Sequence, residues 1–155
     1  MSLPQAEADL LLAMPKVFSG VVIQIELPRS LPFSEELDLE GVGTRERFIL
    51  DLERGNLKRA RLKYQTRARK IYVLARLDLD GRPHRNPPDS PHRPSYRFTG
   101  DHLHLYRENF SDRIAFLPND VPAFPVPTNP DAVRWLIAFL QFCNVQKIPP
   151  IQENI

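Results

Sequence analysis

Apolar residues recur at helical spacing near both ends of the chain. The pattern over residues 4–14 predicts an amphipathic helix that ends before Pro15, because proline disfavours continuation of a helix. Near the C-terminus, a second apolar stripe predicts a helix over about residues 130–143. Asn129 can cap this helix, and Pro130 suits its first position.

Between these helices, apolar and polar residues alternate at the spacing of strands. The alternation is clearest where Leu62 and Tyr64 point one way while Arg61 and Lys63 point the other. Residues 27–43 hold two prolines and many acidic residues, so we expect an irregular connection or an edge there. The expected strands are residues 20–27, 47–53, 57–67, 71–78, 102–106 and 113–117, with a short one at 96–98.

These elements predict a single α+β domain over residues 1–155, since this is an ordinary length for one domain. An antiparallel β-meander of about five or six strands is expected over about residues 20–117. The helices at the two ends are expected to pack together on one face of the sheet.

The composition is that of an ordinary globular protein, with 42% hydrophobic and 26% charged residues. The only cysteine, Cys143, lies in the apolar stripe of the second helix, so we expect neither an internal disulfide nor a thiol nucleophile. No apolar run reaches the ~20 residues that span a bilayer, and the N-terminus does not read as a secretory signal. A cytoplasmic protein without membrane contact is therefore expected.

Basic residues gather in one part of the chain, although the net charge is only +2. Between Arg54 and Arg76 there are nine basic residues and no acidic one. One interpretation is a solvated face that acidic residues elsewhere balance. The other is a footprint for a nucleic-acid backbone, with aromatic side chains stacking on bases. In that interpretation, the nucleic-acid contacts are Arg59, Arg61, Lys63, Arg67, Arg69 and Tyr106.

All four histidines fall between His84 and His104, after and within a proline-rich loop. Histidine exchanges protons near neutral pH and is also a common metal ligand. Five prolines between residues 83 and 94 stiffen the loop that carries the first two histidines. If strands 71–78 and 102–106 share a sheet, Arg76 and Asp78 lie near His102 and His104. The segment therefore predicts a site.

This set of residue types matches what metal-independent cleavage of RNA requires. One imidazole takes the proton of the 2′-hydroxyl, another protonates the leaving oxygen, and arginine stabilises the phosphorane charge. The acid–base candidates are His84, His102 and His104; Arg76 and Arg85 would hold phosphate, and Asp78 and Asn86 would orient the imidazoles. This hypothesis needs no cofactor.

Three other interpretations remain open for the histidine segment. Four histidines with Asp78 or Asp101 are sufficient zinc ligands, but their spacing matches no strong zinc signature, so no metal ligand is assigned. Histidine and asparagine also satisfy backbone groups in shaped loops, which is a structural role. Finally, basic and aromatic residues can bind nucleic acid without cutting it.

Five segments, LERG, YQTRAR, LARLDLDGRPHRNPPD, HLHLY and FLQFCNV, carry a resemblance over roughly residues 46–155. In them the chain resembles a family of small bacterial and phage-associated proteins, a domain of unknown function. It departs from that pattern at Pro88, where the family has aspartate and then glycine, and in the stretch PHRPSYRFTG. The resemblance implies no activity.

A shorter resemblance covers about 30 residues and is carried by Arg76, Asp78, Pro83, His84, His102 and His104. Their order is similar to that in toxins of some bacterial toxin–antitoxin pairs, which implies ribonuclease activity, an RNA substrate and a cognate antitoxin. The leading hypothesis is thus a toxin-like endoribonuclease of a phage or other mobile element. A non-enzymatic module that binds nucleic acid or protein through residues 54–76 is the second, and a metal-binding module is the third. No oligomeric state is predicted.

Overall fold

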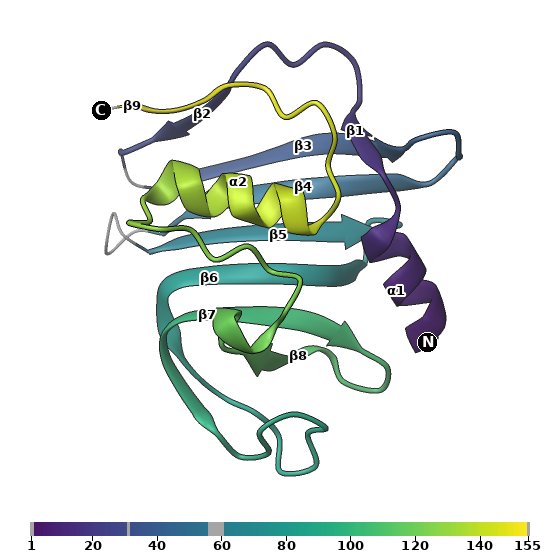
Figure 1. The fold of residues 1–155 in the computed structure, drawn as a ribbon, viewed down its shortest axis with the longest axis vertical. Coiled ribbons are helices and arrows are strands. Elements are labelled where there is room, and N and C mark those ends of the chain that lie inside the picture. The colour runs from purple at the N-terminus through teal and green to yellow at the C-terminus, as the bar shows by residue number, and fades with distance from the viewer. Residues whose placement is uncertain (1, 31, 56–60, 155) are drawn as a thin grey trace.

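The computed structural model describes residues 2–30, 32–55 and 61–154. Over these residues, seven strands form one antiparallel sheet in the order β1-β3-β4-β5-β6-β7-β8, and β2 pairs with β9 in parallel (Figure 1). The α+β prediction holds in outline, but the sheet exceeds the expected five or six strands. The elements are α1 (Gln5–Ala13), β1 (Lys16–Phe18), β2 (Ile25–Pro28), β3 (Phe33–Gly41), β4 (Arg47–Arg54), β5 (Leu62–Ala68), β6 (Tyr72–Arg85), β7 (Arg97–Arg107), β8 (Ser111–Phe116), the 3₁₀ turn η1 (Pro118–Asp120), α2 (Ala132–Phe142) and β9 (Ile151–Asn154).

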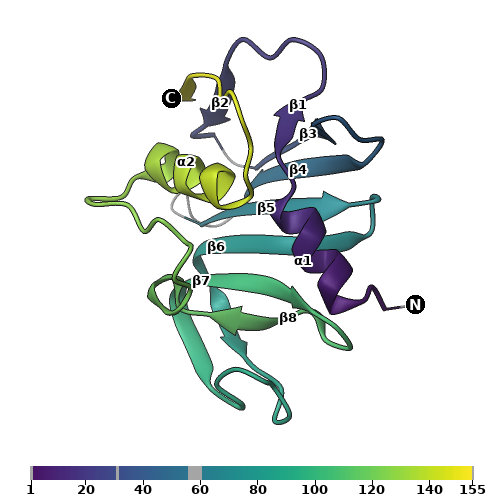
Figure 2. The ribbon, with the colours of Figure 1, turned by 45° about the vertical axis from the view of Figure 1, so that its right-hand side comes forward.

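Both helices lie on one face of the sheet, as Figures 1 and 2 show from two directions. Tyr64 of β5 is fully buried beneath α2, where its ring centroid lies 6.4 Å from that of Phe139. Its hydroxyl donates a hydrogen bond of 2.9 Å to the carbonyl of Ala132. Helix α2 starts two residues later than predicted because the carboxylate of Asp131, rather than Asn129, accepts the N–H of Arg134 as the cap.

The N-terminal part of the sheet differs from the prediction. Residues 20–27 were expected to form one strand, but the strand here is Ile25–Pro28, which pairs with β9 outside the main sheet. Residues 33–41, expected to be an irregular connection or an edge, form the nine-residue strand β3, which pairs with β4 along its length and with the short β1 only at residues 39–41. Its acidic residues alternate with apolar ones, and Arg47 of β4 and Arg67 of β5 pair with Glu40 and Glu36. The pairing across strands outweighs the low strand propensity of the acids.

Strands β6 and β7 form a hairpin that is longer than the sequence predicts. Strand β6 continues past residue 78, where the predicted strand ends, through Gly81 to Arg85, and two irregularities on either side of Gly81 bend the hairpin. Its distal end curls away from the rest of the sheet in Figure 1. His84 consequently lies on a strand, and the proline-rich loop begins only after Arg85.

A bulge between β5 and β6 also changes which residues are buried. Thr66 pairs with Ala75 and Arg67 with Val73, so Leu74 is the extra residue and is buried, although period-two alternation places it on the polar face. Ile71, which the same alternation places in the core, precedes the strand and is exposed. In the part of the chain that the structure describes, no helix is long and apolar enough to cross a membrane.

Candidate functional site

The pairing of β6 with β7 brings four polar side chains together on the face of the sheet opposite the helices. Arg76 lies directly across from His104, and Asp78 lies across from His102. Their neighbours Leu77 and Leu103 pair with each other and point into the core on the other face. The register therefore produces the arrangement that the sequence predicted for these four residues.

Arg76 and Asp78 form a two-pronged ion pair at the centre of this cluster. The Nε and Nη2 atoms of Arg76 lie 2.9 and 3.2 Å from the two carboxylate oxygens, and Nη1 lies 2.9 Å from Asp112 at the start of β8. Burial alone would raise the pKa of Asp78. The positive charge of Arg76 and its hydrogen bonds to the carboxylate act against burial, so this pKa is lowered and the carboxylate stays ionised.

His102 and His104 are both held by backbone carbonyls, with side chains only 1% exposed. The Nδ1 of His102 donates to the carbonyl of Gly100 at 3.0 Å, and that of His104 donates to Asp112 at 2.8 Å. The proton is thereby placed on Nδ1, and each Nε2 keeps a lone pair that faces Asp78. Burial, together with the charge of Arg76, lowers the pKa of His104 and favours this neutral form.

The two Nε2 atoms have different surroundings. That of His104 accepts a hydrogen bond of 2.9 Å from Nη2 of Arg76. That of His102 is buried, and none of the described residues hydrogen-bonds it. It lies 3.5 Å from Oδ2 of Asp78, which is too long for a well-formed hydrogen bond.

His84 joins the cluster from the distal part of β6. Its ring centroid lies 4.7 Å from that of His104 and 6.1 Å from that of His102. Its Nε2 donates to the carbonyl of Arg113 at 2.9 Å and lies 3.1 Å from Oδ1 of Asn86. The Nδ1 atom is therefore the proton acceptor of this ring.

Asn86 is buried and fastens the proline-rich loop to β8. Its Oδ1 accepts the N–H of Ala115, and its Nδ2 donates to the carbonyls of Ala115 and His92. His92 stands apart from the cluster, since its ring stacks on Phe116 at 4.3 Å. Thus three of the four histidines converge, whereas the fourth holds the loop.

A cleft of about 830 Å³ opens beside the cluster. Arg76, Asp78, His84 and His102 line it from β6 and β7, whereas Arg85 does not and instead donates to the carbonyl of Ser95. The other lining residues include four cations, one carboxylate and a short apolar wall, namely Arg54, Arg61, Lys63, Arg82, Glu53, Pro32 and Phe33, so cations outnumber carboxylates. The cleft is therefore suited to an anionic ligand.

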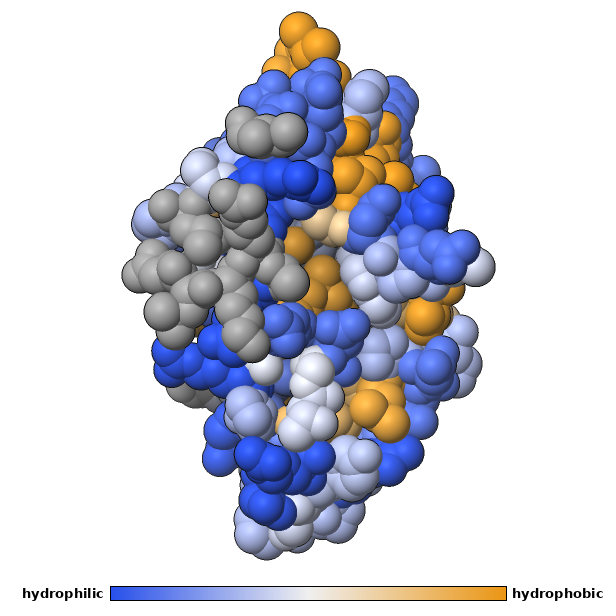
Figure 3. Space-filling view, turned by 90° about the vertical axis from the view of Figure 1, so that its left-hand side faces the viewer, coloured by the Kyte–Doolittle hydropathy of each residue, from blue (hydrophilic) through white to orange (hydrophobic). Residues whose placement is uncertain are grey.

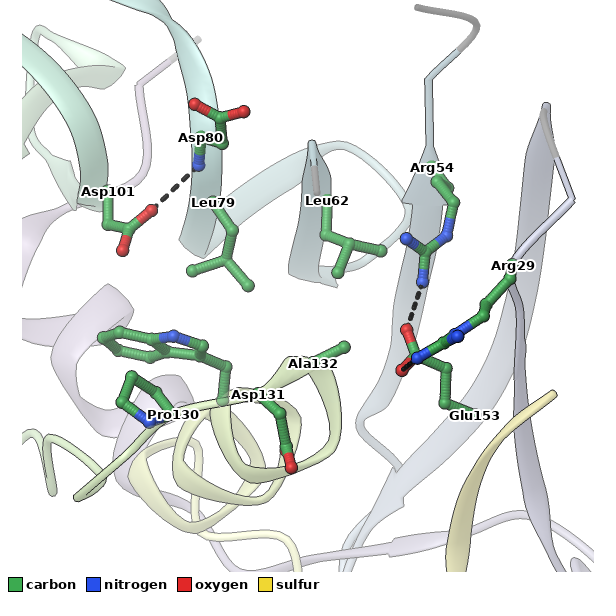
Figure 4. Close-up of a pocket in the computed structure, with 11 residues that line it drawn as sticks. Arg29, Arg54, Leu62, Leu79, Asp80, Asp101, Pro130, Asp131, Ala132 and Glu153 are labelled. Atoms are coloured by element: carbon green, nitrogen blue, oxygen red, sulfur yellow. Dashed lines mark hydrogen bonds and ion pairs between the residues drawn. The ribbon is translucent and has the colours of Figure 1, made fainter. Parts of the chain in front are cut away.

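A second hollow of about 380 Å³ lies on the helix side of the sheet. Figure 3 views the molecule from the left-hand side of Figure 1, and the surface seen there is mostly hydrophilic, with apolar atoms in a central hollow. Figure 4 shows Leu62 and Leu79 in its wall and Glu153 of β9 between Arg29 and Arg54. Its lining includes no histidine, so we place the candidate chemistry in the larger cleft.

Carboxylates pair with much of the basic segment. Arg67 contacts Asp51 at 2.7 Å, Arg69 contacts Glu7 and Glu46, and Lys63 lies 3.3 Å from Glu53. These pairs favour the interpretation of a balanced, solvated face.

The structure also places Tyr106 and Arg61 of the expected nucleic-acid surface. Tyr106 is buried, with its hydroxyl bonded to the N–H and the carbonyl of Leu3, so its ring is not exposed for stacking. Arg61 lines the cleft and donates to the carbonyl of Asp80, and Arg59 lies outside the described residues. The acidic residues of β3 and β4 are the signal in the sequence from which pairing of the basic segment with carboxylates could be expected.

Comparison with known proteins gives one match. The model of DUF6978, a family of unknown function, matches residues 3–145. No curated protein and no solved structure matches the chain.

Proposed function

The chain belongs to this family of unknown function, and we propose that its histidine cluster cleaves phosphodiester bonds in RNA. One observation supports the proposal: three imidazoles, a guanidinium and a carboxylate converge beside a cleft whose walls carry further cations. Convergent titratable groups in a cleft are the usual mark of a catalytic site. The cations suit the charge of a phosphodiester.

RNA carries its own nucleophile, so the protein needs only to move protons and stabilise charge. The 2′-oxygen forms a bond to phosphorus while the bond from phosphorus to the 5′-oxygen breaks. One proton passes from the 2′-hydroxyl to an imidazole of the cluster, and a solvent water protonates the departing 5′-oxygen. Arg76 and Arg82, which both line the cleft, neutralise the charge that builds on the phosphorane oxygens.

We assign proton transfer to His84 and a positioning role to His104. His84 lines the cleft, and the bond from its Nε2 to Arg113 leaves Nδ1 as an acceptor for the 2′-hydroxyl proton. His104 is buried, its Nε2 accepts from Arg76, and it is absent from the lining of the cleft. It therefore orients the guanidinium rather than contacting the substrate.

The chain offers its own control for the experiment. We expect purified protein to cleave a mixed single-stranded RNA, and His84→Ala to slow cleavage by ~10²–10⁴-fold, the usual contribution of one acid–base group. His92→Ala removes the one histidine outside the cluster and should leave the rate within about twofold. Cleavage is followed by gel electrophoresis of labelled RNA, and circular dichroism checks that each variant is folded.

Two results would count against the proposal. One is intact RNA after incubation with the folded wild-type protein, and the other is equal cleavage by wild type and His84→Ala. Binding of RNA without cleavage would instead favour a binding module, and its affinity should then fall steeply with salt. If the protein cleaves RNA inside bacteria, its expression should slow their growth. A protein encoded beside it that restores growth would be the antitoxin expected from the short-motif resemblance.

A further inference from the structure

We infer that Asp78, His102 and His104 bind one divalent transition-metal ion of the zinc class. This inference goes beyond the proposed cleavage of RNA, because metal binding by these three side chains does not require that activity. It also departs from the metal-independent mechanism that the sequence suggested. Four features of the cluster support it.

The first feature is the convergence of three donor atoms. Oδ2 of Asp78 lies 3.5 Å from Nε2 of His102 and 3.6 Å from Nε2 of His104, and all three atoms lie within 4.8 Å of one another. Zinc bonds to nitrogen and oxygen are ~2.0–2.2 Å long, so tetrahedral ligands lie about 3.4 Å apart. The carboxylate is already at that spacing from both imidazoles.

The second feature is the tautomer of the two histidines. Each donates Nδ1–H to a backbone carbonyl, so each offers a neutral Nε2 to the interior of the cluster. Metal-binding histidines are oriented in this way, because the bond to the carbonyl fixes the ring and makes the opposite nitrogen more basic. Two lone pairs that face a carboxylate also repel it unless a cation lies between them.

The third feature is the buried Nε2 of His102, which no described residue hydrogen-bonds. Buried polar atoms in native proteins almost always have a partner. Arg76 supplies a cation to Asp78 and His104, but no bond joins it to His102. A metal ion is a single partner that satisfies all three donors.

The fourth feature is the space around the donors. A Cβ on Gly81 would lie 3.1 Å from Cβ of Asp78 and 3.4 Å from Cε1 of His102, so glycine keeps the cleft side of the donors open. Nη2 of Arg76 occupies part of the ion's position, but Nη1 of the same residue bonds Asp112. When a metal ion takes the three donors, Nη2 gives up its bonds to Asp78 and His104, and the ion pair with Asp112 then orients the guanidinium.

The donors indicate the kind of ion. Two imidazole nitrogens and one carboxylate oxygen suit Zn²⁺, Co²⁺, Ni²⁺ or Fe²⁺, whereas Mg²⁺ and Ca²⁺ prefer oxygen ligands throughout. Three protein ligands leave one position of a tetrahedral ion for water or for an oxygen of the ligand in the cleft. A phosphate oxygen in that position would be polarised by the ion, which makes the phosphorus atom more open to attack.

Metal binding can be measured without any assay of activity. Full-length protein without a histidine tag is stripped with a chelator and titrated with Zn²⁺ in a calorimeter and with Co²⁺ in a spectrometer. We expect one ion per chain and a visible Co²⁺ band of tetrahedral intensity. His102→Ala should weaken binding by at least about 100-fold, whereas His92→Ala should leave it unchanged.

Failure of wild type to bind either ion, or unchanged binding by His102→Ala, overturns the inference. If His102→Ala does not fold, Asp78→Asn keeps the shape of the site while it removes the anionic ligand, and the same loss is expected.

The outcome also separates this inference from the proposed function. Cleavage of RNA by protein that binds no metal would leave the function standing alone. Metal binding without cleavage would leave the inference standing alone.

Discussion

At the scale of single residues, Gly81 decides whether the cluster is accessible. It lies between two register shifts of β6, opposite Gly100, whose φ of +81° is one that other residues rarely adopt. The missing side chain at Gly81 leaves Asp78 and His102 uncovered on the cleft side. Gly81, which the sequence suggests as a turn residue, therefore leaves Asp78 and His102 accessible from the cleft.

Gly81→Ala is expected to disturb the site more than the fold. The added methyl would press on Asp78 and His102, which should weaken Zn²⁺ binding by ~10-fold or more and lower the free energy of unfolding by about 1–2 kcal/mol. Gly55→Ala is the matched control, because a Cβ there meets no atom within 4 Å. Calorimetric titration and urea unfolding measure both effects, and equal results for the two variants would contradict this account of Gly81.

Part of the site could be predicted from residues alone. Period-two alternation and antiparallel pairing were enough to place Arg76 and Asp78 beside His102 and His104, and the register confirms it. The carbonyl partners of the two imidazoles could not be predicted, because they depend on the bend at Gly100 and on the turn before β8. The separation of His92 from the cluster depends on the same loop geometry.

At the scale of elements, one buried lysine joins the ends of both helices. Nζ of Lys16 donates to the carbonyl of Leu12 in the last turn of α1, to that of Met14 just after α1 and to that of Cys143 just after α2, at 2.8–2.9 Å. The ammonium also lies 4.7 Å from the centroid of the Phe48 ring. Cations favour helix C-termini, but nothing in the sequence indicates that this one is fully buried.

Lys16→Met is expected to lower the free energy of unfolding by about 2–4 kcal/mol at pH 7, since three carbonyls lose their donor. The difference in the free energy of unfolding between wild type and Lys16→Met should depend on pH. Burial lowers the pKa of Lys16 from 10.5 to about 8, so between these values the unfolded chain binds a proton that the folded chain does not. The stability of wild type relative to the variant therefore rises with pH across this window, by about 1–3 kcal/mol.

Urea unfolding of both proteins at pH 7 and pH 9.5 tests this prediction. Burial raises the pKa of Cys143 to about 12, which acts in the opposite direction above pH 9, but the thiol is present in both proteins and its effect largely cancels. A stability difference that stays constant with pH would contradict the depressed pKa of Lys16.

At the scale of the whole molecule, β9 near the C-terminus pairs in parallel with β2, which lies more than 120 residues earlier in the sequence. Ile25 and Leu27 are buried at this pairing, and Glu153 of β9 lies 2.9 Å from Arg54. Neither the parallel pairing nor β9 itself could be read from the sequence, because the partners lie far apart along the chain and β9 is only four residues long. The central strands β4 and β5 and the edge strand β8 were predictable, since local alternation specifies them.

Removal of residues 151–155 is expected to destabilise the chain by about 2–4 kcal/mol, because it exposes Ile25 and Leu27 and removes the backbone bonds of the pair. Gln152→Ala changes an exposed side chain of the same strand and should alter stability by less than about 0.5 kcal/mol. Thermal and urea unfolding distinguish the two. A shortened chain as stable as the full one would show that β9 contributes nothing to the fold.

The carboxylates that match the cations of β5 have a kinetic consequence. An electric field from paired charges falls off within a few ångströms, and a net charge of +2 adds little at longer range. A polyanion would therefore arrive by ordinary diffusion rather than by long-range attraction, at a rate that ionic strength changes only modestly. Selection among polyanions would then arise after they reach the protein, from how well each one fits the cleft beside the histidine cluster.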